Sequence, residues 1–68
     1  MSTSTVTVTG MTCGHCVSSV RDEIGNIDSV TAVDVDLASG LVTIDSSEPL
    51  ERSAIQNAVE EAGYQLAE

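Results

Sequence analysis

The chain begins with alternating apolar and polar residues and then changes to the apolar spacing of a helix. Over residues 4–9, valines alternate with polar residues, which predicts a short half-buried strand that ends at Gly10. From Cys16 onward, apolar side chains recur on one helical face, at Val17, Val20, Ile24 and Ile27. The pair Gly25-Asn26 is a stop signal for this helix. A strand, a short loop and an amphipathic helix are therefore expected in that order.

A second alternating stretch predicts a β-hairpin. Residues 32–37 alternate between polar and apolar positions, with the apolar side chains directed inward: Val33, Val35 and Leu37. Residues 38–40 make a tight turn, and residues 41–45 return with Val42 and Ile44 inward. Two alternating runs joined by a short glycine-containing loop are typical of antiparallel strands connected as a hairpin.

The last third of the chain predicts a second helix and a short final strand. Polar residues 46–49 include a proline and interrupt the pattern, and apolar residues then recur at helical spacing, at Ile55, Ala58, Val59 and Ala62. Glu51 is an unusual N-cap for this helix, because Ser, Thr, Asp and Asn are the preferred residues there. Gly63 ends the helix, and residues 64–66 are just long enough for a last strand.

The predicted order of elements is β-α-β-β-α-β. This order is typical of an α+β, ferredoxin-like fold, in which a four-stranded antiparallel sheet carries both helices on one face. A chain of 68 residues is expected to form a single domain, residues 1–68. Val, Ile, Leu and Ala have to fill its core, because the sequence has no Phe or Trp and Tyr64 is its sole aromatic residue.

The charge of the chain excludes two classes of partner. Eleven acidic residues against two basic ones give a formal net charge of −9. Nucleic acids and anionic membranes would repel such a chain, which has no basic stripe to offset the repulsion. No apolar stretch approaches the ~20 residues of a membrane span, and the N-terminus has no signal-peptide pattern. A cytoplasmic location is therefore expected, where thiols stay reduced.

Residues 10–16, Gly-Met-Thr-Cys-Gly-His-Cys, hold both cysteines and the only histidine of the chain. Cys13 is expected in the loop after the first strand and Cys16 in the opening turn of the first helix. Unpaired N–H groups and the positive end of the helix dipole favour thiolate at that turn. Two close thiolates suit a soft monovalent ion of low coordination number, above all Cu(I), with Ag(I) as its surrogate.

Other chemistries fit this segment less well. Structural zinc needs four nitrogen or sulfur ligands, and the chain offers three at most, with His15 between the two cysteines. A thioredoxin-like pair belongs to a longer chain with a βαβ unit before the motif, although a thiol–disulfide redox function is kept as an alternative. The sequence contains no nucleophile–base or acid–base constellation, so no enzyme activity is expected.

The segment at residues 10–16 resembles the Gly-Met-x-Cys-x-x-Cys signature of the heavy-metal-associated domain family. That family includes small bacterial copper chaperones and the N-terminal modules of copper-transporting P-type ATPases. The resemblance extends from Val6 to Leu66 and includes the Glu-Ala-Gly-Tyr sequence at the end of the second helix. It implies that Cys13 and Cys16 bind Cu(I) in a near-linear bis-thiolate site.

The resemblance also suggests roles for two neighbours of the cysteines. Met11 is expected to point into the core beneath the loop and not to bind the ion, although a thioether turned outward can ligate Cu(I). Tyr64 is expected beside the metal loop, where it also packs at the edge of the core. His15 is expected to face solvent. Two other roles for its imidazole stay open: it modulates the basicity of the thiolates, or it is a third ligand of the ion.

These expectations describe a cytosolic Cu(I) chaperone that passes its ion to a partner by thiolate exchange. The expected partner is the metal-binding domain of a copper-transporting P-type ATPase or a copper-responsive regulator, and a Cu(I)-dependent homodimer stays open. An excised N-terminal domain of such an ATPase is the alternative with the same chemistry. Met1 at the start and the end of the chain just after the last strand favour a free-standing protein.

Overall fold

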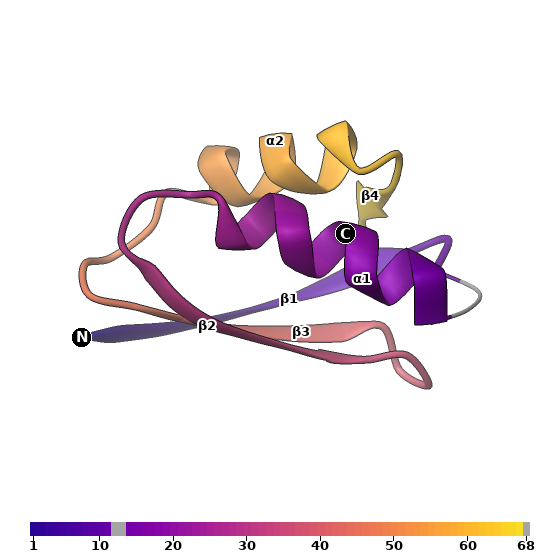
Figure 1. Cartoon of the computed structure of the whole chain (residues 1–68), viewed down its shortest axis with the longest axis horizontal. Helices are drawn as coiled ribbons and strands as arrows, with labels where there is room; N and C mark the ends of the chain where they lie inside the picture. Colours follow the sequence, from indigo (N-terminus) through magenta and orange to yellow (C-terminus); the bar gives the residue numbers. More distant parts are fainter. Residues whose placement is uncertain (12–13, 68) are drawn as a thin grey trace.

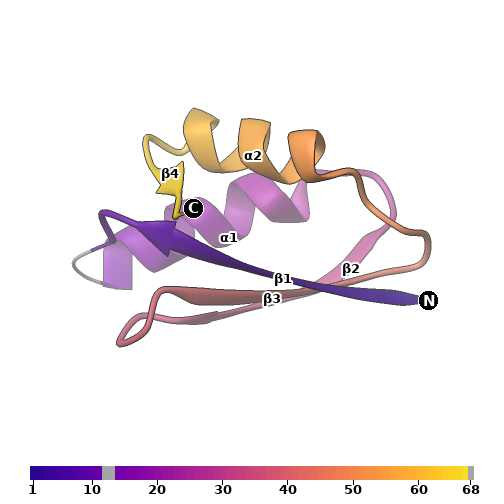
Figure 2. The same ribbon diagram turned by 180° about the vertical axis from the view of Figure 1, so that it is seen from behind.

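The computed structural model describes residues 1–11 and 14–67, whose elements follow the predicted order. They are β1 (Ser2–Thr9), α1 (Gly14–Gly25), β2 (Val30–Asp36), β3 (Leu41–Ser46), α2 (Arg52–Glu61) and β4 (Gln65–Leu66). The strands pair in the order β2-β3-β1-β4, and every neighbouring pair is antiparallel. Both helices lie on one face of the sheet and leave the other face open (Figures 1 and 2). The predicted α+β ferredoxin-like βαββαβ fold is confirmed.

The core lies between the helices and the two central strands, β1 and β3. Its buried cluster consists of Val6, Val8, Val20, Ile24, Val42, Ile44, Ile55, Ala58 and Val59. Valine and isoleucine fill this space without Phe or Trp because their branched side chains pack well on a pleated sheet. Burial of each such side chain contributes roughly 1.5–3 kcal/mol of transfer free energy.

β1 begins at Ser2, two residues earlier than the alternation predicted. The added residues pair with the end of β3, Ser2 with Ser46 and Thr3 with Asp45. The Thr3 hydroxyl also donates a hydrogen bond of 3.0 Å to the Asp45 carboxylate. The added residues are polar, so the hydrophobic pattern carries no signal for them. Backbone pairing and polar side-chain contacts extend this strand.

β2 spans Val30–Asp36, where residues 32–37 were predicted. The pairing of β2 with β3 is irregular between Val30 and Ala32. Such an irregularity inserts an unpaired residue and interrupts the period of two on which the prediction depended. The alternation of apolar and polar residues therefore did not reveal that β2 begins at Val30.

The end of β2 is set by the closure of the turn that follows it. The Gly40 N–H donates to the Asp36 carbonyl oxygen over 2.8 Å, and the Ala38 N–H donates to the Asp36 carboxylate over 3.1 Å. Both bonds end the strand at Asp36, so Leu37 becomes the first residue of the turn. Leu37 is 39% exposed, and the prediction that it faces the core is wrong.

α2 begins after Glu51, whose side chain makes no capping hydrogen bond. The Glu51 carbonyl instead accepts the Ala54 N–H over 3.1 Å, the first bond of the helix. The unusual N-cap predicted from the sequence is therefore present and uses backbone alone. Within residues 1–11 and 14–67, neither helix has the length and hydrophobicity needed to cross a membrane.

Candidate metal site

Three connections of the chain meet at one end of the molecule, at the right of Figure 1. They are the β1–α1 connection, the β2–β3 turn at residues 37–40, and the α2–β4 connection at residues 62–64. They share this end because of the strand directions in the order β2-β3-β1-β4. β3 and β4 are antiparallel to β1, so both begin where β1 ends, and β2 is antiparallel to β3, so it ends where β3 begins. We call this region the loop end, and the predicted site residues that the structure describes, Met11, His15, Cys16 and Tyr64, lie in it.

Cys16 is the third residue of α1 and is half-buried. The N–H groups of a first helical turn have no partner within the helix, and they present a partial positive charge. The first turn of α1 contains no acidic residue that would oppose a thiolate there. Cys16 thus occupies the helical position that the sequence predicted, whereas Cys13 lies outside the described residues.

His15 is exposed in the same turn of α1. Its backbone carbonyl accepts a hydrogen bond of 3.2 Å from the Ser19 hydroxyl. In the part of the chain that the structure describes, no three side chains of His, Cys, Asp or Glu gather closely enough to hold a metal ion. The solvent-facing position of His15 agrees with the expectation from the sequence.

Met11 follows β1 and is half-buried, with its side chain packed against the core cluster. A flexible thioether side chain fills irregular space at the edge of a core. This contact agrees with the expected packing role of Met11. A thioether held in this way supports the chain where it leaves the sheet.

The end of α2 fixes the backbone of Tyr64. The Tyr64 N–H donates to the Val59 carbonyl over 3.1 Å, and the Gly63 N–H donates to the Glu60 carbonyl over 2.9 Å, with Gly63 at φ 95°. This pair of bonds is a Schellman motif, which requires a residue in the left-handed region just after the helix. The motif explains why glycine precedes Tyr64, and it directs the chain from α2 back toward β1.

The ring of Tyr64 lies against Gly10. A Cβ atom placed on Gly10 would be 3.3 Å from Cδ1 of Tyr64 and 3.9 Å from its Cε1. Tyr64 is also half-buried and packed against the core cluster. The packing of the Tyr64 ring on Gly10, which immediately precedes Met11, agrees with the expectation that Tyr64 lies beside the loop.

Gly40 joins the β2–β3 turn to β1, a contact that the sequence pattern did not reveal. The Val8 N–H donates to the Gly40 carbonyl over 2.9 Å. Gly40 is buried at φ 76°, and a Cβ atom there would be 2.6 Å from the Val8 carbonyl oxygen. Only glycine fits such an approach. The sequence offered one signal, a glycine at the end of a hairpin turn, and this signal does not specify the strand that the turn contacts.

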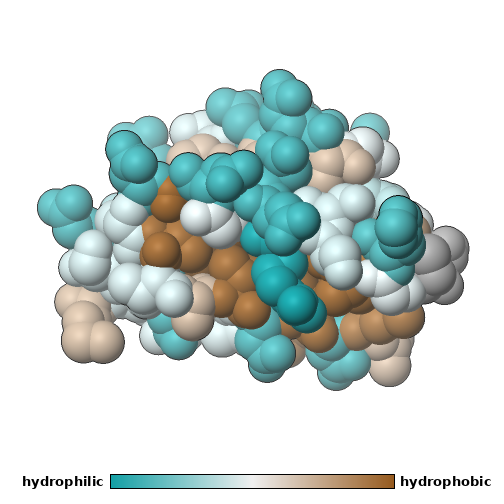
Figure 3. All heavy atoms as spheres, in the orientation of Figure 1, coloured by the Kyte–Doolittle hydropathy of each residue, from teal (hydrophilic) through white to brown (hydrophobic). Residues whose placement is uncertain are grey.

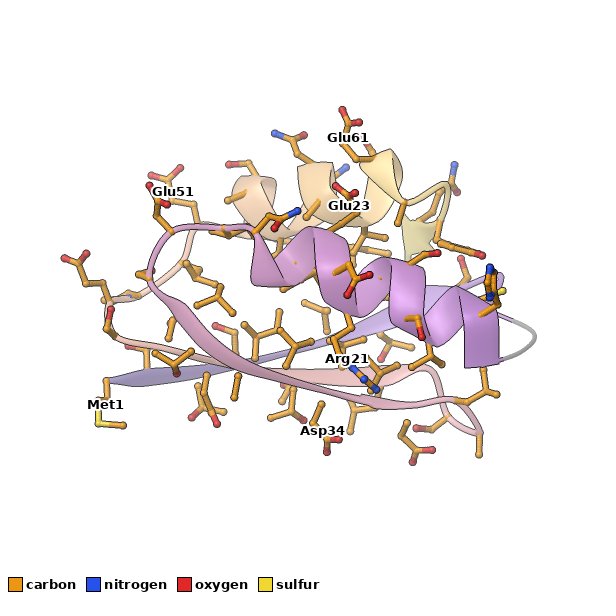
Figure 4. The ribbon with its side chains drawn as sticks, in the orientation of Figure 1. Met1, Arg21, Glu23, Asp34, Glu51 and Glu61 are labelled. Carbon is orange, nitrogen blue, oxygen red and sulfur yellow. The ribbon has the colours of Figure 1, made fainter. Side chains whose placement is uncertain are left out.

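Acidic side chains surround the molecule. Glu23 and Glu61 point outward from α1 and α2, and Asp34 points away from the opposite face of the sheet (Figure 4). Arg21, one of the two basic residues of the chain, extends from α1 over β2 in the same view. The negative charge is therefore spread over both faces.

Comparison with known proteins gives the family. The model of the heavy-metal-associated domain matches residues 5–65. The copper chaperone CopZ of Staphylococcus aureus is 39% identical over 67 residues, which cover 97% of this chain and 98% of that protein. The chain belongs to the heavy-metal-associated domain family.

Solved structures agree with this assignment. A CopZ metallochaperone has a TM-score of 0.90 and 37% identity, with 97% of this chain and 100% of that chain covered. A copper binding domain from HMA7, a P-type ATPase, has a TM-score of 0.89 and 29% identity, with 98% of this chain and 92% of that chain covered. The similarity therefore extends over nearly the whole length of this chain and of each of the two solved chains.

Proposed function

We propose that this protein is a cytoplasmic Cu(I) chaperone, formed by one domain of residues 1–68, that holds Cu(I) between Cys13 and Cys16. The observation that carries the proposal is the 39% identity with a copper chaperone over 97% of this chain, together with its Cys-x-x-Cys segment. The half-buried position of Cys16 in the first turn of α1 supports it. A reducing compartment suits the proposal, because the ligands are thiolates.

The chemistry follows from the preference of Cu(I) for few, soft ligands. Both thiols lose their protons as Cu⁺ binds, so the net charge changes by one unit, from −9 to −10. In transfer, a thiolate of the partner adds to the bound ion and gives a three-coordinate intermediate. One of the original cysteine sulfurs then leaves, and a second exchange completes the transfer. These steps exchange only thiol protons and copper–sulfur bonds and convert no substrate into a product, so the protein acts as a carrier and not as an enzyme.

The proposed partner is the metal-binding domain of a copper-transporting P-type ATPase. The similarity to a copper binding domain of a P-type ATPase supports this partner, since thiolate exchange needs comparable sites on both proteins. The same similarity supports the alternative that this chain is itself a tethered domain of an ATPase. The length of the parent reading frame distinguishes the two.

An anaerobic competition titration against a strong Cu(I) chelator tests the metal site. The expected result is one tightly bound Cu(I) per chain. The Cu(I) affinity of Cys13→Ser and of Cys16→Ser should be at least about a hundredfold lower, since loss of a residue that only hydrogen-bonds to a metal ligand already lowers metal affinity 10–100-fold. Ser18→Ala, at an exposed neighbouring position of α1, is the matched control and should bind as the wild type does.

Two results would contradict the proposal. Wild-type affinity in Cys16→Ser would mean that the ion binds elsewhere. Failure of the wild type to compete for Cu(I), together with turnover of a Cys13–Cys16 disulfide by a reductant, would favour the redox alternative.

A further inference from the structure

Two exposed leucines lie at the β2–β3 turn of the loop end, Leu37 as the first residue of the turn and Leu41 directly after it. Among the described residues, the large apolar side chains that are exposed are Met1, Leu37 and Leu41, and the last two are 39% and 42% exposed. Ala38 lies between them in the same turn and is also exposed. We call Leu37, Ala38 and Leu41 the hairpin tip.

Leu37 continues an apolar seam between α1 and β2, whereas Leu41 pairs with Asp36 and lies on the open face of the sheet. The seam contains half-buried residues of the edge strand that pack against the core, Val30, Val33 and Val35. In Figure 3, brown apolar surface lies below α1 on both sides of a teal hydrophilic side chain, where Figure 4 labels Arg21, and its right-hand part lies toward the end of the molecule with the β2–β3 turn. An isolated exposed leucine is ordinary, but apolar surface that gathers next to a binding site is typical of interfaces.

The hairpin tip is held rigidly. The Leu41 N–H donates to the Ser39 hydroxyl over 3.2 Å, and Asp36 accepts two hydrogen bonds from within the turn. The bond between Val8 and Gly40 then fastens the turn to β1. A surface fixed before binding loses little conformational entropy when a partner covers it.

The distance from the tip to the metal loop decides what covers the tip. Gly40 is bonded to Val8, and Gly10 follows two residues later, about 7 Å further along an extended chain. A specific interface buries about 800 Å² on each protein, which is a disc about 16 Å in radius. A partner domain centred near Gly10 therefore extends over the hairpin tip.

We propose that the hairpin tip is an apolar anchor for the partner domain that exchanges Cu(I) with this protein. This inference rests on the proposed function. The partner is a metal-binding domain with basic side chains around an apolar patch. Basic charge is required because the chain carries −9, and because Asp36 and Asp34 adjoin the tip. The same charge disfavours a second copy of this chain as the occupant.

The test uses Leu37→Gln/Leu41→Gln, in which each glutamine keeps an aliphatic stem and adds a polar end. Ala32→Gln is the matched control, because Ala32 is exposed in β2 about 13 Å from Asp36, the residue that precedes the hairpin tip. The partner probe is the metal-binding domain of the copper-transporting P-type ATPase from the same genome. Cu(I) transfer is followed by stopped-flow measurements, and contacts by chemical-shift changes in the ¹⁵N-labelled protein.

We expect the double variant to bind the partner and transfer Cu(I) about tenfold less well, since the two exposed portions together approach one leucine side chain. Its own Cu(I) affinity and thermal stability should match those of the wild type, as should the transfer rate of Ala32→Gln. In the wild type, amide signals of the hairpin tip should shift when the partner is added.

Three results would overturn the proposal: transfer at the wild-type rate by the double variant, a parallel loss of its own Cu(I) affinity, or self-association that the variant abolishes while transfer persists. Failure of the wild type to bind Cu(I) would instead overturn the proposed function. In that case, the chemical-shift changes of the hairpin tip on addition of the partner domain still decide whether the tip is a docking surface.

Discussion

Gly40 is the residue whose replacement tests the architecture of the loop end most directly. In Gly40→Ala, the new Cβ atom would lie 2.6 Å from the Val8 carbonyl oxygen, on a residue at φ 76°. The atom it meets is backbone in the central strand β1, so rotation of a side chain cannot relieve the contact. Either β1 or the turn has to move.

The expected loss of stability has two parts. A non-glycine residue in the left-handed region costs roughly 1–2 kcal/mol. Separation of the turn from β1 breaks the Val8–Gly40 hydrogen bond and adds about 1–2 kcal/mol. The sum of about 2–4 kcal/mol is a large share of the roughly 3–10 kcal/mol typical of a chain of this length. The melting temperature should fall by about 14–28 °C.

Substitutions at two other glycines measure the two contributions to this loss of stability separately. Gly63 has φ 95° but open space around its Cβ position, so Gly63→Ala should cost the left-handed part alone, about 1–2 kcal/mol. Gly25 ends α1 with open space and no positive φ, so Gly25→Ala should be neutral or stabilising by up to about 1 kcal/mol. Urea unfolding of the apo proteins under reducing conditions measures all three. Equal losses for Gly40→Ala and Gly63→Ala would refute the close approach of the turn to β1.

Three further outcomes are expected. His15→Ala should leave the Cu(I) affinity within about twofold of wild type, because the histidine is exposed; a tenfold loss in the chelator titration would make it a ligand. Val59→Ala should lower the free energy of unfolding by about 2–3 kcal/mol, because Val59 is fully buried; a loss below about 1 kcal/mol in urea would contradict its packing. The apparent Cu(I) affinity should rise between about pH 6 and about pH 9, because protons compete for both sulfurs; a flat profile would mean that both are already ionised.

The fold could be predicted because its helices and strands each bury one face. The helical spacing identified Val20, Ile24 and Val59, all of which are buried, and the alternation identified Val42 and Ile44. These signals come from side chains that contact the core. Elements held by backbone pairing gave no such signal, which is why the first residues of β1 were missed.

Leu37 was wrongly assigned to the core-facing side of β2 because the alternation of apolar and polar residues was continued one residue beyond the end of the strand. The bonds that close the turn on Asp36 depend on an aspartate side chain and a glycine four residues later, and the hydrophobic pattern does not record them. The position of Cys16 in the first turn of α1 was predicted from a local motif. The contacts of Gly10 with Tyr64 and of Gly40 with Val8 join residues far apart in sequence, so local patterns could not supply them.

The packing of Tyr64 on Gly10 gives the molecule a built-in optical reporter. No tryptophan or second tyrosine is present, so the near-ultraviolet emission of the unlabelled protein arises from this one ring. Movement of the chain at Gly10 changes the surroundings of the ring, with no background from elsewhere. Loading and release of Cu(I) at the proposed site can therefore be followed in real time without a dye.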